Sequence, residues 1–199
     1  VALPLLLAAC VAWAVMLPLS LPHAAVPRAL TAGAGKVLHL AFAGLAALTA
    51  WLSLALARQQ GAWFVLSLLL LVWIADTAAY FVGRKWGRHK LALHISPGKT
   101  WEGAVAGLLA AGVYGAGCTL LAGSYFLAVA GPHWALAALL AMVLAAVSIC
   151  GDLFESVLKR QAGVKDSSAL LPGHGGFLDR LDALLPTLPL ALLIYDVWA

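Results

Sequence analysis

Long apolar runs alternate with short polar connections along the whole chain. Six of these runs reach about 20 residues, the length that a helix needs to cross roughly 30 Å of hydrocarbon. They lie at about 2–20, 37–57, 62–83, 103–122, 133–151 and 183–199. None alternates with the period of two that marks a barrel strand, and the backbone of a membrane segment must satisfy its own hydrogen bonds. The pattern therefore predicts an all-α polytopic membrane protein, a helical bundle with about six transmembrane helices.

The composition supports a lipid environment. Hydrophobic residues make up 64% of the 199 residues and charged residues only 10%, which is far outside the range of soluble globular domains. Cys10, Cys118 and Cys150 are widely spaced within apolar runs. They fit neither a disulfide framework nor a CxxC metal site, so we interpret them as small core residues.

The acidic residues divide the chain into two parts. Residues 1–58 hold the first two apolar runs and no acidic residue, whereas residues 59–199 carry all eight. We expect the first part to be N-terminal transmembrane helices and the second to be the transmembrane domain that carries the chemistry. The chain begins at Val1 inside an apolar run, without a basic segment or a small-residue cleavage site, so we expect no signal peptide.

Basic residues gather in two connections separated by two apolar runs. The first connection holds Arg84, Lys85, Arg88, Lys90 and Lys99, and the second holds Lys159, Arg160, Lys165 and Arg180. Because cytoplasmic loops carry the excess of Lys and Arg, and two spans return the chain to the same side, both connections are expected to face the cytoplasm. This predicts a multi-pass protein of the cell (inner) membrane with its polar loops on the cytoplasmic face.

One charged stretch continues the apolar run 133–151. Asp152, Glu155, Ser156 and Lys159 follow at positions i, i+3, i+4 and i+7, which places them on one face of a helix that leaves the membrane. They can form one polar wall. An ordinary solvated helix end, with Glu155 and Lys159 as an i,i+4 ion pair, explains the same spacing, and this motif alone does not decide between the two.

A glycine-rich turn precedes the last apolar run. Gly173, His174, Gly175 and Gly176 are followed by Asp179, Arg180 and Asp182, so both aspartates are expected in the first turn of the last helix. A capping role explains one acid at that place, but not two beside an arginine. Glycines let backbone amides approach an anion closely, although such a turn is a weak signal by itself. A lone histidine there is more often structural than catalytic.

A third group of polar residues surrounds the end of the run 62–83. Asp76 lies about two turns inside this span, where a carboxylate is costly unless it faces a wet cavity or a partner. The basic residues that follow can simply bind anionic lipid headgroups. Ser96-Pro-Gly-Lys99-Thr100 is typical of a helix start and leaves Lys99 free to reach a phosphate. It is not a P-loop, because the upstream glycine is absent.

Carboxylates for a divalent metal, cations for phosphates and a glycine-rich turn thus gather at one membrane face. This combination indicates phosphoryl or nucleotidyl transfer to a lipid, in which metals neutralise charge and position the attacking and leaving oxygens. The residues alone do not name the nucleotide.

The charged stretches resemble the signature of a known family. The second half reads Ser156-x2-Lys159-Arg160-x4-Lys165-Asp166-x7-His174-Gly175-Gly176-x2-Asp179-Arg180-x-Asp182, and the first half reads Asp76-Thr-x-Ala-Tyr80-x2-Gly83-Arg84 and Ser96-Pro97-x-Lys99-Thr100-x-Glu102-Gly103. Over about residues 60 to 185 the chain is similar to the phosphatidate cytidylyltransferases, also called CDP-diacylglycerol synthases. Members of that family carry further N-terminal spans, and this chain is shorter by about two.

The resemblance implies a reaction and a set of roles. A phosphatidate oxygen attacks the α-phosphorus of CTP, pyrophosphate leaves in line, and CDP-diacylglycerol forms without a nucleophilic side chain. Asp152 and Asp179 are then metal-binding carboxylates, with Asp182 and Glu155 as further candidates for the metal. The catalytic set is Asp152, Asp179, Lys159, Arg160 and Asp182. The substrate-binding set is Asp76, Ser96, Lys99, Thr100, Ser156, Lys165, Asp166, His174, Gly175, Gly176 and Arg180.

The expected cofactor is Mg²⁺, with a second monovalent or divalent cation left open. The expected partners are CTP, phosphatidic acid and the bilayer, without nucleic acid, and a homodimer is left open. Two other functions compete with this interpretation. A cytidylyltransferase for another lipid phosphate would keep these residues and change only the apolar cleft. A membrane ion or phosphate transporter could use Asp76 and the basic connections, but it predicts discontinuous helices and charge at mid-membrane.

Overall fold

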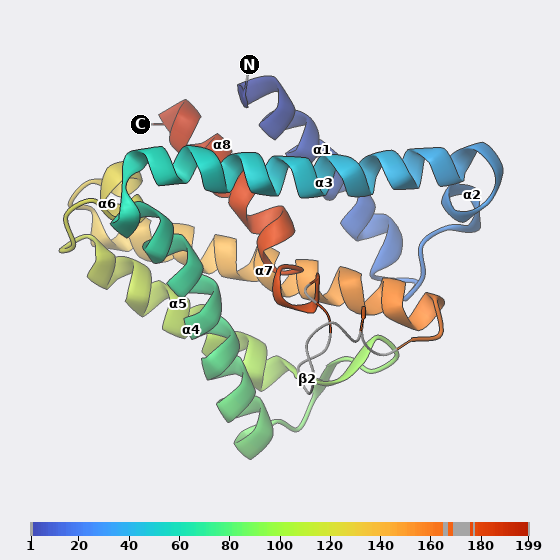
Figure 1. Ribbon diagram of the computed structural model, residues 1–199. Coiled ribbons are helices and arrows are strands. Elements are labelled where there is room, and N and C mark those ends of the chain that lie inside the picture. Colours follow the sequence, from blue (N-terminus) through green and yellow to red (C-terminus); the bar gives the residue numbers. More distant parts are fainter. Residues whose placement is uncertain (1, 165–166, 169–175, 177, 199) are drawn as a thin grey trace.

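The structure of the chain is a computed structural model that describes residues 2–164, 167–168, 176 and 178–198. Helices dominate these residues, with one small hairpin of two strands (Figure 1). The elements are α1 (Ala2–Ser20), α2 (Arg28–Thr31), α3 (Gly33–Gln60), α4 (Ala62–Trp86), β1 (Lys90–Ala92), β2 (Ser96–Thr100), α5 (Trp101–Cys118), α6 (Tyr125–Ala130), α7 (Trp134–Gln161), the 3-10 helix η1 (Leu178–Arg180) and α8 (Leu184–Trp198). The all-α fold predicted from the apolar runs is confirmed.

Each of the six apolar runs forms a helix. Four of the helices, α1, α3, α4 and α7, are long and apolar enough to cross a membrane, and α8 is a shorter apolar helix of 15 residues. On α1 the exposed residues Leu3, Leu7, Val11, Val15 and Leu19 recur every four positions. Such a stripe lies on one helix face, and lipid is the solvent that suits it. The chain is a membrane protein.

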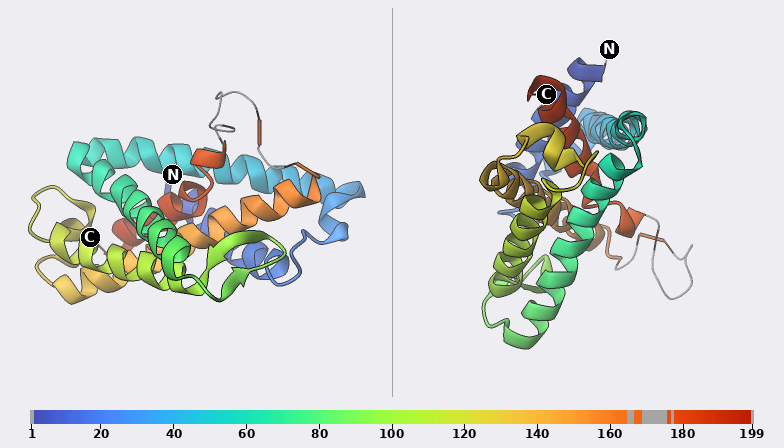
Figure 2. Two further views of the ribbon diagram at one scale, coloured as in Figure 1. Left: turned by 90° about the horizontal axis from the view of Figure 1, so that it is seen from below. Right: turned by 90° about the vertical axis from the view of Figure 1, so that its left-hand side faces the viewer.

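Small residues bring α4, α5 and α7 into close contact. Helices α4 and α5 run side by side (Figures 1 and 2), with Gly103 and Gly107 of α5 facing the carbonyl groups of α4. A Cβ atom at Gly107 would lie 2.8 Å from the carbonyl oxygen of Ala75, and one at Gly115 would lie 2.4 Å from the Cβ atom of Ala141 on α7. Close packing of small residues is a main source of helix association in lipid. It fixes the walls between which the polar residues lie.

The basic connection after α4 folds into a hairpin. Strands β1 and β2 are antiparallel, with Lys90 opposite Thr100 and Ala92 opposite Ser96, and the unequal spacing marks a bulge. Thr100 then caps α5 by accepting a hydrogen bond from the Gly103 backbone N–H at 3.2 Å. The helix start expected at Ser96–Thr100 is therefore confirmed, and the cap fixes the hairpin to α5.

The segment before α8 corrects one expectation. Helix α7 continues past its apolar part to Gln161, as predicted, but neither Asp179 nor Asp182 lies in the first turn of α8. Asp179 belongs to η1, and Asp182 lies in the turn that follows it, where its Oδ1 accepts from the Ala183 backbone N–H at 2.7 Å. This turn packs closely on α7, because a Cβ atom at Gly151 would lie 2.8 Å from the Asp182 carbonyl oxygen. Helix α8 begins only at Leu184, after the turn that packs against Gly151 of α7.

Candidate functional site

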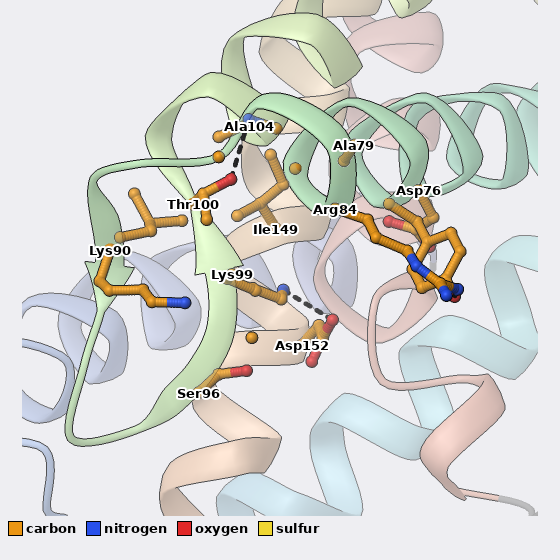
Figure 3. A pocket seen from close by; sticks show the side chains of 16 residues that line it. Asp76, Ala79, Arg84, Lys90, Ser96, Lys99, Thr100, Ala104, Ile149 and Asp152 are labelled. Carbon is orange, nitrogen blue, oxygen red and sulfur yellow. Dashed lines mark hydrogen bonds and ion pairs between the residues drawn. The ribbon is translucent and has the colours of Figure 1, made fainter.

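A polar cavity of about 690 Å³ lies between α4, α5, the hairpin and α7. Figure 3 shows the side chains that surround it. Its polar and basic lining consists of Asp76, Tyr80, Arg84, Lys90, Ser96, Lys99, Thr100 and Asp152. Residues of the first basic connection and of α4 thus meet Asp152 of α7 at one cavity, although 76 positions separate Asp76 from Asp152 in the sequence. The volume suits a ligand larger than a single phosphate.

An ion pair crosses this cavity. The Lys99 Nζ atom lies 2.6 Å from Asp152 Oδ2, which joins β2 to α7 (Figure 3). Both side chains are about a quarter to a third exposed, so the pair remains accessible to a ligand. We expected Lys99 to be free for a phosphate, but in this structure the Asp152 carboxylate is its partner. An incoming phosphate would therefore compete with Asp152 for the same ammonium group.

The basic rim of the cavity continues along α4. Arg84 Nη1 donates a hydrogen bond to the Tyr80 hydroxyl at 2.8 Å, and both side chains line the cavity together with Asp76. These residues follow one another at intervals of four, so they share one face of α4. Asp76 therefore faces the polar cavity, where we expected it. Arg84 and Lys90 also line it, whereas the sequence alone left them as headgroup-binding residues.

A second charged group lies at the end of α7. The Lys159 ammonium lies between two carboxylates, 2.8 Å from Glu155 Oε2 and 2.9 Å from Asp179 Oδ1. The i,i+4 pair of Glu155 and Lys159, which the spacing left as one of two alternatives, is therefore present, but Lys159 also pairs with Asp179. The backbone N–H groups of Gly176 and Ser167 donate to Asp179 at 2.6 and 3.1 Å. The carboxylate thereby joins Ser167 and Gly176, the last residue of the glycine-rich turn, to Lys159 of α7.

These contacts set the charge of Asp179. Burial alone raises its pKa, but the Lys159 ammonium and the N–H groups of Gly176 and Ser167 outweigh this and hold the pKa well below the usual range. Asp179 is therefore ionised at neutral pH. The ionised carboxylate anchors the Lys159 ammonium group.

Asp182 has the opposite environment. Its side chain is buried, and burial together with the neighbouring Asp152 carboxylate raises its pKa to about 6. The Glu155 carboxyl also lies close enough to act on Asp182. Asp152, Glu155 and Asp182 therefore influence one another and form one carboxylate cluster, which we call the α7 cluster. It joins the polar cavity, through Asp152, to the ion pairs of Lys159.

The remaining predicted site residues divide into three groups. Ser156 adjoins the α7 cluster, since its hydroxyl lies 3.5 Å from Asp152 Oδ1. Arg160 points elsewhere, because its Nε donates to the Ile95 carbonyl oxygen at 3.3 Å and so joins α7 to the hairpin. Outside the described residues lie Lys165, Asp166, His174 and Gly175, and for Arg180 only the backbone is described.

The cluster can be tested for its fit to a metal ion. Among the described residues, no three His, Cys, Asp or Glu side chains are arranged to hold an ion by themselves. Mg²⁺ does not require such a cage, because it commonly takes one or two carboxylates and completes its coordination with water and substrate phosphates. Asp152 and Asp182 supply two such carboxylates that repel each other, and Glu155 Oε1 is a buried oxygen that receives no hydrogen bond from the described residues. The donor set of the α7 cluster therefore fits a divalent cation shared with a substrate.

Comparisons with known proteins give the context of these residues. A model of the cytidylyltransferase family matches residues 2–198. A phosphatidate cytidylyltransferase of Pseudomonas aeruginosa is 40% identical over 189 residues, which cover 92% of this chain and 66% of that protein. One of Haemophilus influenzae is 44% identical over 130 residues, covering 65% and 44%, and one of Brucella suis is 45% identical over 163 residues, covering 80% and 56%. The chain thus spans between 44% and 66% of the length of these three relatives.

Proposed function

The chain belongs to the cytidylyltransferase family, and we propose that it carries the catalytic part of a phosphatidate cytidylyltransferase. The reaction joins CTP and phosphatidic acid into CDP-diacylglycerol and releases pyrophosphate. The observation that carries the proposal is the convergence of Lys99 and Asp152 in a polar cavity beside the α7 cluster, within a helical membrane domain. Cations and carboxylates at one site are what phosphate transfer to a lipid requires.

The bond changes assign work to the residues of the cavity. An oxygen of phosphatidate forms a bond to the α-phosphorus of CTP while the bond to pyrophosphate breaks, so no side chain needs to become a nucleophile. Lys99, Lys90 and Arg84 line the cavity and bind the negatively charged phosphates. Lys159 is held between Glu155 and Asp179 and keeps these carboxylates in place. Positioning and charge neutralisation are the main contributions that a protein makes to such a step.

We propose that Asp152 and Asp182 hold Mg²⁺. The family resemblance implied Asp152 and Asp179, but the Asp179 carboxylate already receives the Lys159 ammonium and the N–H groups of Gly176 and Ser167. Asp179 is therefore proposed, with Glu155, as a neighbouring carboxylate of the same site. The ion would neutralise phosphate charge and orient the attacking and leaving oxygens when it is bound. A second cation remains a prediction. Because Asp152 belongs to the α7 cluster and also pairs with Lys99, the ion would lie close to the Lys99 ammonium group.

The proposal includes a location and partners. Basic residues surround the polar cavity, and the rule for Lys and Arg in loops places them, with the active site, on the cytoplasmic face of the cell inner membrane. There CTP reaches the cavity from water and phosphatidic acid from the bilayer. Assembly as a homodimer stays a prediction.

Two alternatives make different predictions. A cytidylyltransferase for another lipid phosphate is distinguished by comparing lipid acceptors in one assay. A transporter is disfavoured by α4, which continues without interruption from Ala62 to Trp86 through the position of Asp76. The described parts of α7 likewise show one continuous helix.

The proposal is tested with purified protein in liposomes that contain phosphatidic acid, with CTP and Mg²⁺ added and CDP-diacylglycerol measured. Asp179→Asn keeps the shape of the side chain but removes its charge, so turnover should fall by orders of magnitude, about 100-fold or more, while the fold survives. Arg88→Gln, in an exposed residue beside the hairpin, is the control and should lose far less. Turnover of Asp179→Asn close to that of the wild type would exclude a role for this carboxylate in catalysis.

A further inference from the structure

A second cavity lies beside α7 and does not coincide with the polar one. It has a volume of about 130 Å³ and is enclosed by α1, α3, α7, η1 and the start of α8. Figure 1 shows α3 crossing above α7. Gly151 and Glu155 lie on the side of α7 that faces this cavity, whereas Asp152 faces the polar cavity. The α7 cluster therefore lies between two cavities, with Asp182 and Glu155 on the wall of the second.

The walls of the second cavity are mostly hydrocarbon and aromatic rings. They include Phe42, Phe154, Leu158, Leu178 and Leu185. Two of its surrounding helices, α1 and α3, carry exposed apolar residues on their outer faces and are long enough to span the membrane. An apolar ligand can therefore approach this cavity from the bilayer rather than from water.

Buried polar atoms that lack partners are rare in native proteins and call for an explanation. This cavity has three among its lining residues: Trp13 Nε1, His39 Nδ1 and Glu155 Oε1, none of which has a hydrogen-bond partner among the described residues. Trp13 is only 5% exposed, and its ring is fixed by edge contacts with Phe42 and Phe154 at centroid distances of 4.9 and 5.3 Å. Rigid packing of a side chain with an unused N–H is consistent with a ligand that accepts its hydrogen bond.

The chemistry of these atoms limits the class of ligand. The Trp13 indole N–H can only donate, and His39 Nδ1 donates in the tautomer that carries its proton there. The Glu155 carboxyl belongs to the α7 cluster and already accepts a hydrogen bond from Lys159 through Oε2. Two donors in apolar walls complement acceptor oxygens on an apolar body. Ester carbonyl groups of a glycerolipid have this character, because they accept hydrogen bonds and are flanked by acyl chains.

We propose that the second cavity binds the glycerol ester region of the diacyl lipid substrate, with Trp13 Nε1 and His39 Nδ1 donating to its ester carbonyl oxygens. The inference rests on the proposed function, which supplies a lipid that must reach the α7 cluster. Its phosphate would meet the nucleotide at the cluster, while its chains leave between α1 and α3 toward the bilayer. The two substrates would then approach the cluster from opposite sides of α7.

The test compares diacyl phosphatidate with its dialkyl ether analogue, which has the same phosphate and chains but no carbonyl oxygen. Binding is measured in a detergent without ester groups, and turnover is measured with CTP and Mg²⁺ in parallel. One or two buried hydrogen bonds correspond to about a fivefold to tenfold preference for the ester. The wild type should show this preference in both the dissociation constant and KM, with kcat nearly equal for the two lipids.

Trp13→Phe removes the donor but keeps an aromatic ring, and it should reduce the preference for the ester to about twofold or less. Trp51→Phe is the matched control, because Trp51 lies on α3 with 67% of its surface exposed, and it should keep the preference of the wild type. His39→Phe provides a second, independent removal of a donor. If Trp13→Phe lowers the melting temperature strongly, the ratio measured for His39→Phe decides the outcome.

The proposal is overturned if the wild type binds the ester and the ether equally, or if both donor variants keep the preference of Trp51→Phe. Failure of the proposed function gives a different result. In that case no CDP-diacylglycerol forms with either lipid, while the binding measurement still reports whether the cavity prefers the ester. Equal binding of diacyl phosphatidylcholine would assign the cavity to bulk membrane lipid and would also contradict a substrate site.

Discussion

Replacing Lys159 by Met should destabilise the protein strongly, because one ammonium group serves two buried carboxylates. Its Nζ atom lies 2.8 Å from Glu155 and 2.9 Å from Asp179, and the three side chains are only 19%, 6% and 14% exposed. Met keeps most of the aliphatic stem, so the change removes the charge while packing is largely retained. Glu155 and Asp179 then remain buried without their cation.

The expected magnitude follows from this burial. Breaking a buried ion pair by removing one partner costs about 3–5 kcal/mol, because the other charge stays desolvated. For a chain of this length, each kcal/mol corresponds to about 2–4 °C, so the melting temperature should fall by on the order of 10 °C. Adding Glu155→Gln removes one of the two uncompensated charges, and the double variant should recover part of that loss.

The measurement is thermal unfolding of the purified protein in detergent with a chelator present, so that no divalent ion replaces the ammonium. Lys85→Met is the control, because Lys85 is exposed and rests over the Trp86 ring at 4.7 Å, and its effect should stay within about 0.5 kcal/mol. A Lys159→Met protein that melts together with the Lys85→Met control would refute the reasoning. So would a double variant that is less stable than Lys159→Met alone.

Three further changes test other parts of the structure. Asp182→Asn should raise the melting temperature at pH 7.5 but not at pH 3.5. Because the pKa of Asp182 is raised to about 6, the wild type loses up to about 3 kcal/mol of stability as the pH rises from 3.8 through 6. A pH series of melting curves with a chelator present checks this. Gly107→Ala should cost about 1–3 kcal/mol because its Cβ would lie 2.8 Å from the Ala75 oxygen, whereas Gly117→Ala on the same helix meets nothing within 4 Å and should be neutral or stabilising in the same unfolding assay. Hydrogen bonds from its own backbone, the His89 side chain and nearby N–H groups lower the pKa of Glu102 to about 2. The hydrogen bond from the His89 backbone N–H to Glu102 therefore persists above pH 4.5 and is lost as the pH falls toward 2. Hydrogen exchange at the His89 amide should rise over that range, and Glu102→Gln should abolish the pH dependence.

The sequence predicted the parts of the structure that local periodicity controls. The apolar runs predicted the helices, and the spacing of Glu155 and Lys159 offered their ion pair as one of two alternatives. The partner of Lys99 could not be predicted, because Asp152 lies 53 positions later and the pair forms only when β2 meets α7. The polar residues of α4 were partly readable, since Tyr80 and Arg84 have the i,i+4 spacing of a side-chain pair, but headgroup binding explained Arg84 equally well.

The residues at which helices near the site begin could not be predicted from the sequence either. Asp179 and Asp182 suit a helix N-terminus by residue type, yet the crossing at Gly151 delays α8 until Leu184. A tertiary contact thus overrides the local preference there. Trp13 and His39 were not identified as candidates, because a single polar atom in an apolar helix gives no periodic signal. Only the cavity that they share marks them.

The arrangement around Lys159 has a consequence for synthesis of the protein. Chains fold from the N-terminal end as they are made, so α7 is complete before residue 179 is added. Glu155 and Lys159 lie one turn apart in the same helix and can neutralise each other at once, with no need for later segments. When Asp179 is added, it meets an ammonium group that is already positioned, and its bonds to Ser167 and Gly176 follow. The end of the nascent helix therefore carries its acid with a cation already beside it, before the segment that supplies Asp179 has been made.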